Sequence, residues 1–477
     1  MSTDLSVPSV YADVMLTSPL LLLPALAFLT ASVWLWRRTW TGVHHVPVLH
    51  GTAVVAFLLA AGRWGSHIGL PATPPIFLTD LLITGAIAHY ILTRGTQTRP
   101  AGPGVALGLL ATWSLLRYLV GEPWQLDAIR DVVPYLYAGV GILSAYSFGR
   151  ATPAARARTV RLLYGAMVVH LAWVLAVQIY PTLATVATVP GSEVEFLTIR
   201  SDFDGAIIGV TAAIALRRFL IGKQRLGGAV VLVAAAFTLL PSGSRGAWLA
   251  VAVSLGLAVY AATVATASTP NRQRLVVFAT VTACAFGAAW LPETNVGQRS
   301  ANVLAEEGPG AGTASARITA WTETIDYTNE TTPRQLFGVG FGPNYLQATD
   351  TMDVLRGSRE TELRAAHNIL VGTYARSGAV GLVLFLWVLT LVARAGWRLR
   401  RRFADDELLL TCAALTAGLF AAAAVGVILE SPFGAVPFYW SAGILLAAAR
   451  SDRRPGRVDG ADRKFSVLLT ESSHLRV

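Results

Sequence analysis

Apolar runs long enough to cross a lipid bilayer recur from one end of this sequence to the other. The hydrocarbon core of a bilayer is about 30 Å thick, so a spanning helix needs about 20 mostly apolar residues. Backbone groups that face lipid must be hydrogen-bonded within their own segment, which favours helices. The runs lie approximately at 15–36, 46–62, 75–93, 103–120, 128–148, 162–182, 203–217, 227–241, 246–267, 275–291, 368–393, 407–428 and 436–449. The sequence therefore predicts an all-α fold, a polytopic transmembrane helical bundle of about 12–13 spans.

Composition and charge indicate which partners such a chain takes. Of its 477 residues, 54% are hydrophobic and only 14% are charged, too few charges for a soluble protein to cover its apolar surface. The net charge of +10 comes from short basic clusters between apolar runs. We therefore expect a lipid bilayer as partner and no nucleic acid. Cys284 and Cys412 lie inside apolar runs and predict neither a disulfide framework nor a zinc site.

The basic clusters also predict the orientation in the membrane. They lie at 37–38, 94–99, 150–161, 217–225, 272–274, 394–402 and 450–464. Each follows an odd-numbered apolar run, so all of them can face the cytoplasm, as the positive-inside rule requires. The N-terminus is then outside and the C-terminus inside, in a multi-pass protein of the cell (inner or plasma) membrane.

This topology divides the chain into five parts. Residues 1–14 form an extracytoplasmic tail without a basic residue, and so not a clean signal peptide. Transmembrane helices 1–10 occupy residues 15–291, and helices 11–13 occupy residues 368–449. Residues 292–367 form a large extracytoplasmic loop, which is too long for a simple connector and is predicted to contain short helices, one of them at 314–327. The basic tail at 450–477 is expected to be disordered in the cytoplasm.

Ionisable side chains gather at the outer ends of the predicted spans. Arg130, Arg200 and Arg245 lie there, and the large loop adds Arg317 and His367. A single charge at such a place can simply mark a helix end at the interface. Several arginines together need another explanation, because the positive-inside rule predicts few of them outside. We therefore expect an extracytoplasmic active site, where ATP is absent and a donor must arrive already activated on a carrier such as a lipid.

A tight turn at 242–246, with the sequence Ser-Gly-Ser-Arg-Gly, joins two of the apolar runs. It holds Ser244 and Arg245 at the membrane surface, where a lipid-linked diphosphate would lie. A guanidinium group binds phosphate oxygens in a bidentate way and keeps its charge. The alternative interpretation is an arginine that snorkels from a helix end.

Two further pairs belong to the large loop and its end. Arg317 and Trp321 are four residues apart and share one face of the predicted loop helix. The indole could stack on a sugar, or it could anchor the helix in the membrane interface. His367 and Asn368 begin the eleventh span, where a histidine can take a proton near neutral pH. The alternative is a capping or buried, hydrogen-bonded histidine.

Two motifs with familiar spacing carry less weight. The glycine-rich stretch 337–344 resembles a nucleotide-binding loop, but no βαβ unit surrounds it, so we expect a compact turn near the site. Asp202 and Asp204 form a D-x-D pair, which holds a divalent metal in many glycosyltransferases. Such pairs are common and Arg200 is adjacent, so metal binding is the minority interpretation. We predict no metal site and no cofactor.

Taken in order, these motifs resemble the O-antigen ligase and O-antigen polymerase superfamily of membrane glycosyltransferases. The resemblance covers roughly residues 45–450 and is densest from 240 to 385. It rests on Ala-Ile-Arg-Asp at 128–131, the turn 242–246, Ser-Ala-Arg at 315–317 with Trp321, the glycine-rich 337–342, and His367-Asn368 followed by Gly378 and Gly381. It implies a core of twelve helices that starts in the cytoplasm, which leaves open whether the first span belongs to that core.

The resemblance also implies a reaction. The donor would be a glycan on undecaprenyl diphosphate, and the acceptor a glycan, a lipid or a protein. Arg245 and Arg317 would bind the diphosphate as it leaves, and His367 would deprotonate the acceptor hydroxyl, which attacks the anomeric carbon with inversion. The transfer would be metal-independent. The residues that would bind the substrates are Arg130, Arg200, Ser244, Trp321 and Asn368, although the sequence around Arg200 departs from the family pattern.

Two other classes of function stay open on the sequence. One is a membrane transporter of a small anion such as bicarbonate, and the other is a scaffold whose outer loop binds a partner. A transporter should hold its charged site near the bilayer midplane, within broken helices. The charges of this chain crowd the outer rim instead, which favours the enzyme.

Overall fold

The computed structural model is almost entirely helical, and the predicted all-α class is confirmed. The structure describes residues 48–70, 76–93, 102–121, 125–185, 187–189, 194–221, 224–265, 298, 311–352 and 364–452. Within them the strands are β1 (Gly69–Leu70) and β2 (Ile76–Phe77), a short antiparallel pair. The spans expected at 15–36 and 275–291 and the tail expected at 1–14 lie outside the described residues, as does most of the tail at 450–477.

The helices follow the predicted runs. In chain order they are α3 (Thr52–Ala61), α4 (Arg63–Ser66), α5 (Leu78–Thr93), α6 (Gly102–Val120), α7 (Leu126–Leu136), α8 (Ala138–Arg150), α9 (Pro153–Ile179), α10 (Ser201–Ile221), α11 (Arg225–Leu239), α12 (Arg245–Ala265), α15 (Ala311–Asn329), α16 (Thr332–Phe337), α17 (Tyr345–Ala348), α19 (Ile369–Leu399), α20 (Glu407–Ala423) and α21 (Pro432–Ser451). Short 3-10 turns among the described residues are η2 (Pro181–Thr185), η4 (Arg400–Ala404) and η5 (Ile428–Glu430). The run expected at 128–148 is divided between α7 and α8, just after Pro134 removes a backbone donor from α7.

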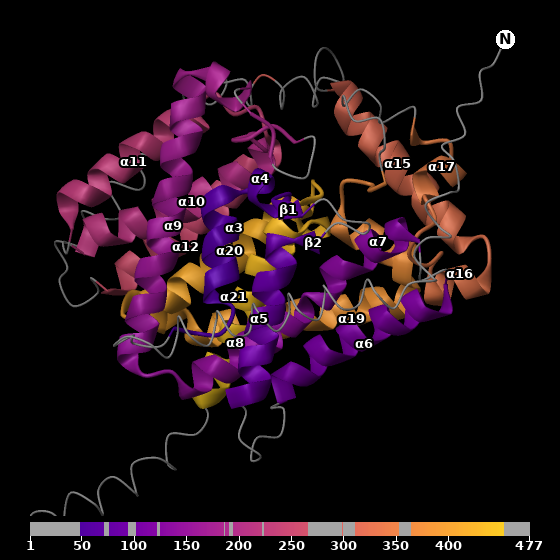
Figure 1. The fold of residues 1–477 in the computed structure, drawn as a ribbon, viewed down its shortest axis with the longest axis horizontal. Coiled ribbons are helices and arrows are strands. Elements are labelled where there is room, and N and C mark those ends of the chain that lie inside the picture. The colour runs from indigo at the N-terminus through magenta and orange to yellow at the C-terminus, as the bar shows by residue number, and fades with distance from the viewer. Residues whose placement is uncertain are drawn as a thin grey trace, which may run out of the picture.

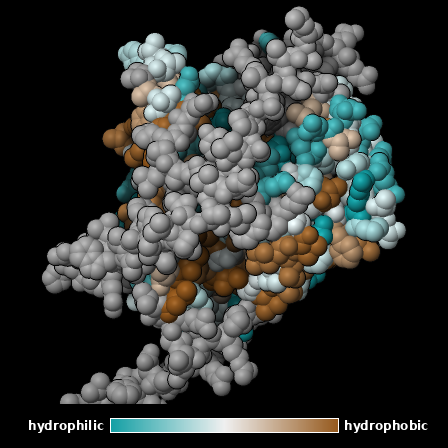
Figure 2. All heavy atoms as spheres, turned by 45° about the vertical axis from the view of Figure 1, so that its right-hand side comes forward, coloured by the Kyte–Doolittle hydropathy of each residue, from teal (hydrophilic) through white to brown (hydrophobic). Residues whose placement is uncertain are grey.

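Several of these helices are long enough to cross a membrane. Among the described residues, 5 stretches have the necessary length and apolar composition, namely Leu126–Arg150, Pro153–Ile179, Arg245–Ala265, Ile369–Ala404 and Pro432–Ser451. Shorter apolar helices accompany them, so the chain is a polytopic helical protein. Large apolar side chains stay exposed on their outer faces, as a lipid environment permits. Figure 2 shows hydrophobic side chains gathered on the lower part of one face, with hydrophilic ones above them.

Helices α10 and α12 are in close backbone contact. A Cβ added to Gly205 would lie 2.4 Å from the Cβ of Ala247, and one added to Gly209 would lie 2.9 Å from the Cα of Val251. Small residues at such contacts let backbones approach closely, and the resulting van der Waals packing contributes to helix association in lipid. Helix α20 packs on both, and Figure 1 shows the three side by side. The N-terminal ends of α10 and α12 are thereby brought together.

The large loop is folded onto one end of the bundle. The helix predicted at 314–327 lies within α15, and α16 and α17 follow it. Figure 1 shows these three helices together beside α7 and α19. Helices α15 and α17 share a small core with the start of α19 and the residue segment before it, made of Ala320, Tyr345, Leu346, Ala366, Val371 and Ala375. This core fixes the loop to the segment that leads into α19.

Helix α19 is interrupted at Gly378, where the loop touches it. Gly378 has φ 65° and ψ −167°, a left-handed conformation that glycine adopts without strain. A Cβ there would lie 2.3 Å from the carbonyl oxygen of Leu336, at the end of α16. The break therefore lets the backbone of α16 pack directly against α19.

We expect Gly378→Ala to lower the free energy of unfolding by at least about 2 kcal/mol, from left-handed strain and the clash with Leu336. Gly396→Ala is the matched control, because it lies on the same helix and a Cβ there would meet nothing within 4 Å. That variant should be neutral or gain up to about 1 kcal/mol from helix propensity. Thermal unfolding of both variants in detergent measures the difference, and equal midpoints would contradict the packing described.

Candidate functional site

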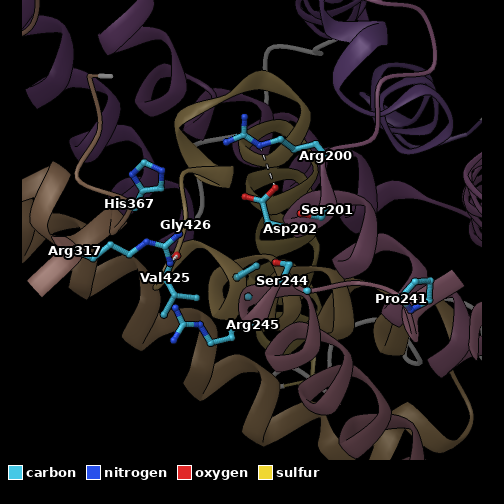
Figure 3. A pocket seen from close by; sticks show the side chains of 13 residues that line it. Arg200, Ser201, Asp202, Pro241, Ser244, Arg245, Arg317, His367, Val425 and Gly426 are labelled. Atoms are coloured by element: carbon cyan, nitrogen blue, oxygen red, sulfur yellow. Dashed lines mark hydrogen bonds and ion pairs between the residues drawn. The ribbon is translucent and has the colours of Figure 1, made fainter. Parts of the chain in front are cut away.

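A cavity of about 420 Å³ lies at the end of the bundle where α10 and α12 begin. It brings together side chains that are far apart in the sequence (Figure 3). Among the predicted site residues, those that line it are Arg200, Ser244, Arg245, Arg317 and His367. The remaining lining residues are Ser201, Asp202, Pro241, Gly243, Gly246, Ala422, Val425 and Gly426. The three residues predicted to be catalytic therefore share one cavity.

Two helix N-termini supply part of the site. Arg245 is the first residue of α12, and the hydroxyl of Ser244 accepts a hydrogen bond from the Ala247 N–H at 3.3 Å. Arg200 directly precedes α10 and its N–H donates to Asp204 at 2.5 Å. Each N-terminus carries a partial positive charge and N–H groups without a helical acceptor, so both favour an anion between them.

Positive side chains dominate the cavity. The guanidinium of Arg317 donates to the carbonyl oxygen of Val425 at 3.1 Å, and that of Arg200 contacts Asp202 at 3.2 Å. Burial and the nearby charge of Arg245 lower the pKa of Arg317, and Asp202 opposes this effect. Among the described residues that line the cavity, three carry a guanidinium group and one carries a carboxylate (Figure 3). A bound anion with several oxygens could accept hydrogen bonds from these guanidinium groups.

His367 enters the cavity from the segment before α19. Its backbone is left-handed, with φ 57°, which is uncommon for a residue with a side chain. Its Nδ1 lies 3.1 Å from the carbonyl oxygen of Ala365. A carbonyl only accepts, so Nδ1 carries the proton and Nε2 of the neutral ring is the nitrogen that can accept one. The ring is therefore held in the tautomer that a general base needs.

The D-x-D pair is separated in the fold. Asp202 lines the cavity, whereas Asp204 is buried and lies 3.4 Å from His170. The two carboxylates therefore do not converge on one ion. Among the described residues, no group of three or more His, Cys, Asp or Glu side chains could hold a metal.

Three residues predicted to bind substrate are not among those that line the cavity. Trp321 donates to the carbonyl oxygen of Ala366 at 2.5 Å and packs on the core of the loop. Asn368 caps α19, since its side chain accepts from the N–H groups of Leu370 and Val371. Arg130 lies on α7 and is not among the lining residues. Trp321 and Asn368 thus fix the backbone on the two sides of His367.

The turn that follows α20 is the part of the site that sequence reasoning missed. Val425 and Gly426 contribute backbone and close one wall of the cavity. Every residue carries a carbonyl, so no residue type in the sequence signals that the one at Val425 accepts from Arg317.

Comparison with known proteins adds one match. Residues 229–386 match the family model described as O-antigen ligase. No curated protein matches the chain. The matched segment contains Arg245, Arg317 and His367, the three residues that meet in the cavity.

If the cavity is an anion site, it should bind inorganic diphosphate. Arg317→Gln should raise the dissociation constant at least about tenfold, because a charge-assisted hydrogen bond contributes roughly 1.5–3 kcal/mol. Arg334→Gln is the control, since Arg334 lies outside the cavity and pairs with Glu330 at 2.7 Å. Titration calorimetry of the purified protein measures both constants, and an equal effect of the two substitutions would rule out a specific site.

Proposed function

The match of residues 229–386 supports membership of the O-antigen ligase superfamily, and from this premise we propose that the chain is a metal-independent, inverting glycosyltransferase. It moves a glycan from undecaprenyl diphosphate to an acceptor hydroxyl on the extracytoplasmic side of the membrane. The family supports a transferase of the ligase or polymerase type, so the product is a cell-surface polysaccharide joined to a glycan, a lipid or a protein.

The observation that carries the proposal is the meeting of His367, Arg245 and Arg317 in one cavity. Transfer from a lipid diphosphate requires two operations. One proton must leave the acceptor hydroxyl, and the negative charge that develops on the leaving diphosphate must be stabilised. A histidine with an acceptor Nε2 performs the first, and fixed guanidinium groups perform the second.

The steps follow from these roles. Nε2 of His367 takes the proton of the acceptor hydroxyl, whose oxygen attacks the anomeric carbon from the face opposite the diphosphate. The bond between that carbon and the diphosphate oxygen breaks, and undecaprenyl diphosphate leaves with the electron pair. Arg245, Arg317 and the N-terminus of α12 stabilise its charge. A diphosphate is a good leaving group, so the scheme needs no general acid.

The transporter alternative explains fewer of these features. A transporter would hold its charged site within broken helices, near the midplane of the bilayer. Helix α19 is broken at Gly378, but the backbone of α16 fills that break. The cavity lies instead at helix ends, beside the folded loop.

We expect His367→Ala to abolish glycan transfer while insertion and folding are retained, because loss of a general base costs about 10²–10⁴ in rate. Lipid-linked glycan should accumulate in cells that carry the variant. His67→Ala is the control, since His67 lies beside β1 and is not among the lining residues. Transfer to the acceptor and the lipid-linked pool are measured together. A variant with full transfer would remove His367 as the base, and an unchanged pool with altered solute uptake would favour a transporter.

A further inference from the structure

A buried cluster of charges lies beside the segment that leads to His367. We propose that Asp131 is a positioning residue, which fixes the backbone before His367 through Arg364 and Arg376. This inference rests on the proposed function, because it concerns the placement of the proposed base. Asp131 itself is not among the residues that line the cavity.

One oxygen of Asp131 collects three donors. Its Oδ2 accepts from Arg364 Nη2 at 2.9 Å, from Arg376 Nη1 at 2.5 Å and from the N–H of Gly342 at 3.1 Å. These donors come from three separate parts of the chain, namely the segment before α19, α19 itself and the glycine-rich turn. A single carboxylate on α7 therefore connects all three.

The cluster continues directly into the backbone before His367. Arg376 Nη2 donates to the carbonyl oxygen of Arg364 at 3.0 Å, so both ends of Arg364 are held. Two residues later, the N–H of Ala366 donates to the hydroxyl of Tyr345 at 3.1 Å. The carbonyl oxygen of Ala366 accepts from the indole of Trp321. The backbone from Arg364 to Ala366 is thus fixed on several sides, directly before the proposed base.

This restraint matches the conformation of His367. A residue with a side chain in the left-handed region is strained, and such strain persists only where the surrounding structure determines it fully. Hydrogen bonds to Arg364 and Ala366 hold the backbone before His367 in this way. Without them, the segment can relax and move the ring from its place in the cavity.

Burial makes the Asp131 carboxylate hard to replace. The side chain of Asp131 is 5% exposed and that of Arg376 is 3% exposed. Loss of the carboxylate would leave two guanidinium groups with too little negative charge beside them, in a place that water hardly reaches. Asp127 offers the contrast on the same helix. It bonds to Arg364 at 2.9 Å, but its side chain is 49% exposed.

The test compares Asp131→Asn with Asp127→Asn, which make the same chemical change one helical turn apart. Asp131→Asn should lower kcat for glycan transfer by about ten- to a hundredfold, since small displacements of a reacting group are costly. The KM for the lipid-linked donor should change less than about threefold, because Arg245 and Arg317 are untouched. Asp127→Asn should change kcat less than about twofold, as expected of an exposed pair.

Rates are expressed per folded molecule, counted by size-exclusion chromatography of the purified protein. A merely structural role would lower the yield of folded protein and leave kcat per folded molecule unchanged, and that result would overturn the proposal. If Asp131→Asn does not fold, Tyr345→Phe decides. It removes one hydroxyl that accepts from Ala366 and should lower kcat by about tenfold. Tyr374→Phe is the matched control, because it removes an exposed hydroxyl that donates to Asn329 instead.

The same assay with His367→Ala separates the two ideas. If His367→Ala transfers glycan at the normal rate, the proposed function fails. If His367→Ala is inactive while Asp131→Asn or Tyr345→Phe keeps the normal kcat, only the positioning role fails. Loss of kcat in all three, with the two controls active, supports both.

Discussion

Close backbone contact between α10 and α12 is the constraint on which the site depends. Gly205 against Ala247 and Gly209 against Val251 leave no space for larger side chains between the two helices. These contacts lie within the first nine residues of each helix, so the two helices run side by side from their N-terminal ends, and both begin at the cavity. Their N-terminal dipoles then add at one point, and the arginines that precede or open each helix are carried there with them. The positive charge at this end of the cavity thus follows from the packing of α10 against α12.

That packing holds like charges together. Arg200, Arg245 and Arg317 line one cavity, and Asp202 is the one acidic residue among the lining residues that the structure describes. The Val425 carbonyl bonds with Arg317 but adds no charge. The depressed pKa of Arg317 reflects the cost of burial next to another cation. Such a gathering of cations suits a ligand with negative charge, and the diphosphate of the proposed donor has several oxygens that can accept hydrogen bonds.

Much of this could be predicted from the sequence, because a bilayer permits few folds. The length of the apolar runs predicts helices. Arginines are uncommon on the outer side of a membrane, so Arg245 and Arg317 stand out there, as does His367 at the start of a span. Side-chain direction could not be predicted. Trp321 shares a helical face with Arg317, but its indole bonds the Ala366 carbonyl rather than lining the cavity. Asp202 and Asp204 likewise separate, since the pair spans the first turn of α10 and only Asp202 reaches the cavity.

Helix α15 joins the two halves of the proposed chemistry. Arg317 extends from it into the cavity, and Trp321, one turn later, bonds to the residue before His367. Arg317 would stabilise the leaving diphosphate, and Trp321 fixes the backbone before the proposed base. Both residues belong to one helix. A donor that fixes Arg317 also fixes the position of α15, and hence the backbone of His367. In the proposed reaction, leaving-group stabilisation and proton removal would then act as a unit, and the effects of removing each part alone would not add.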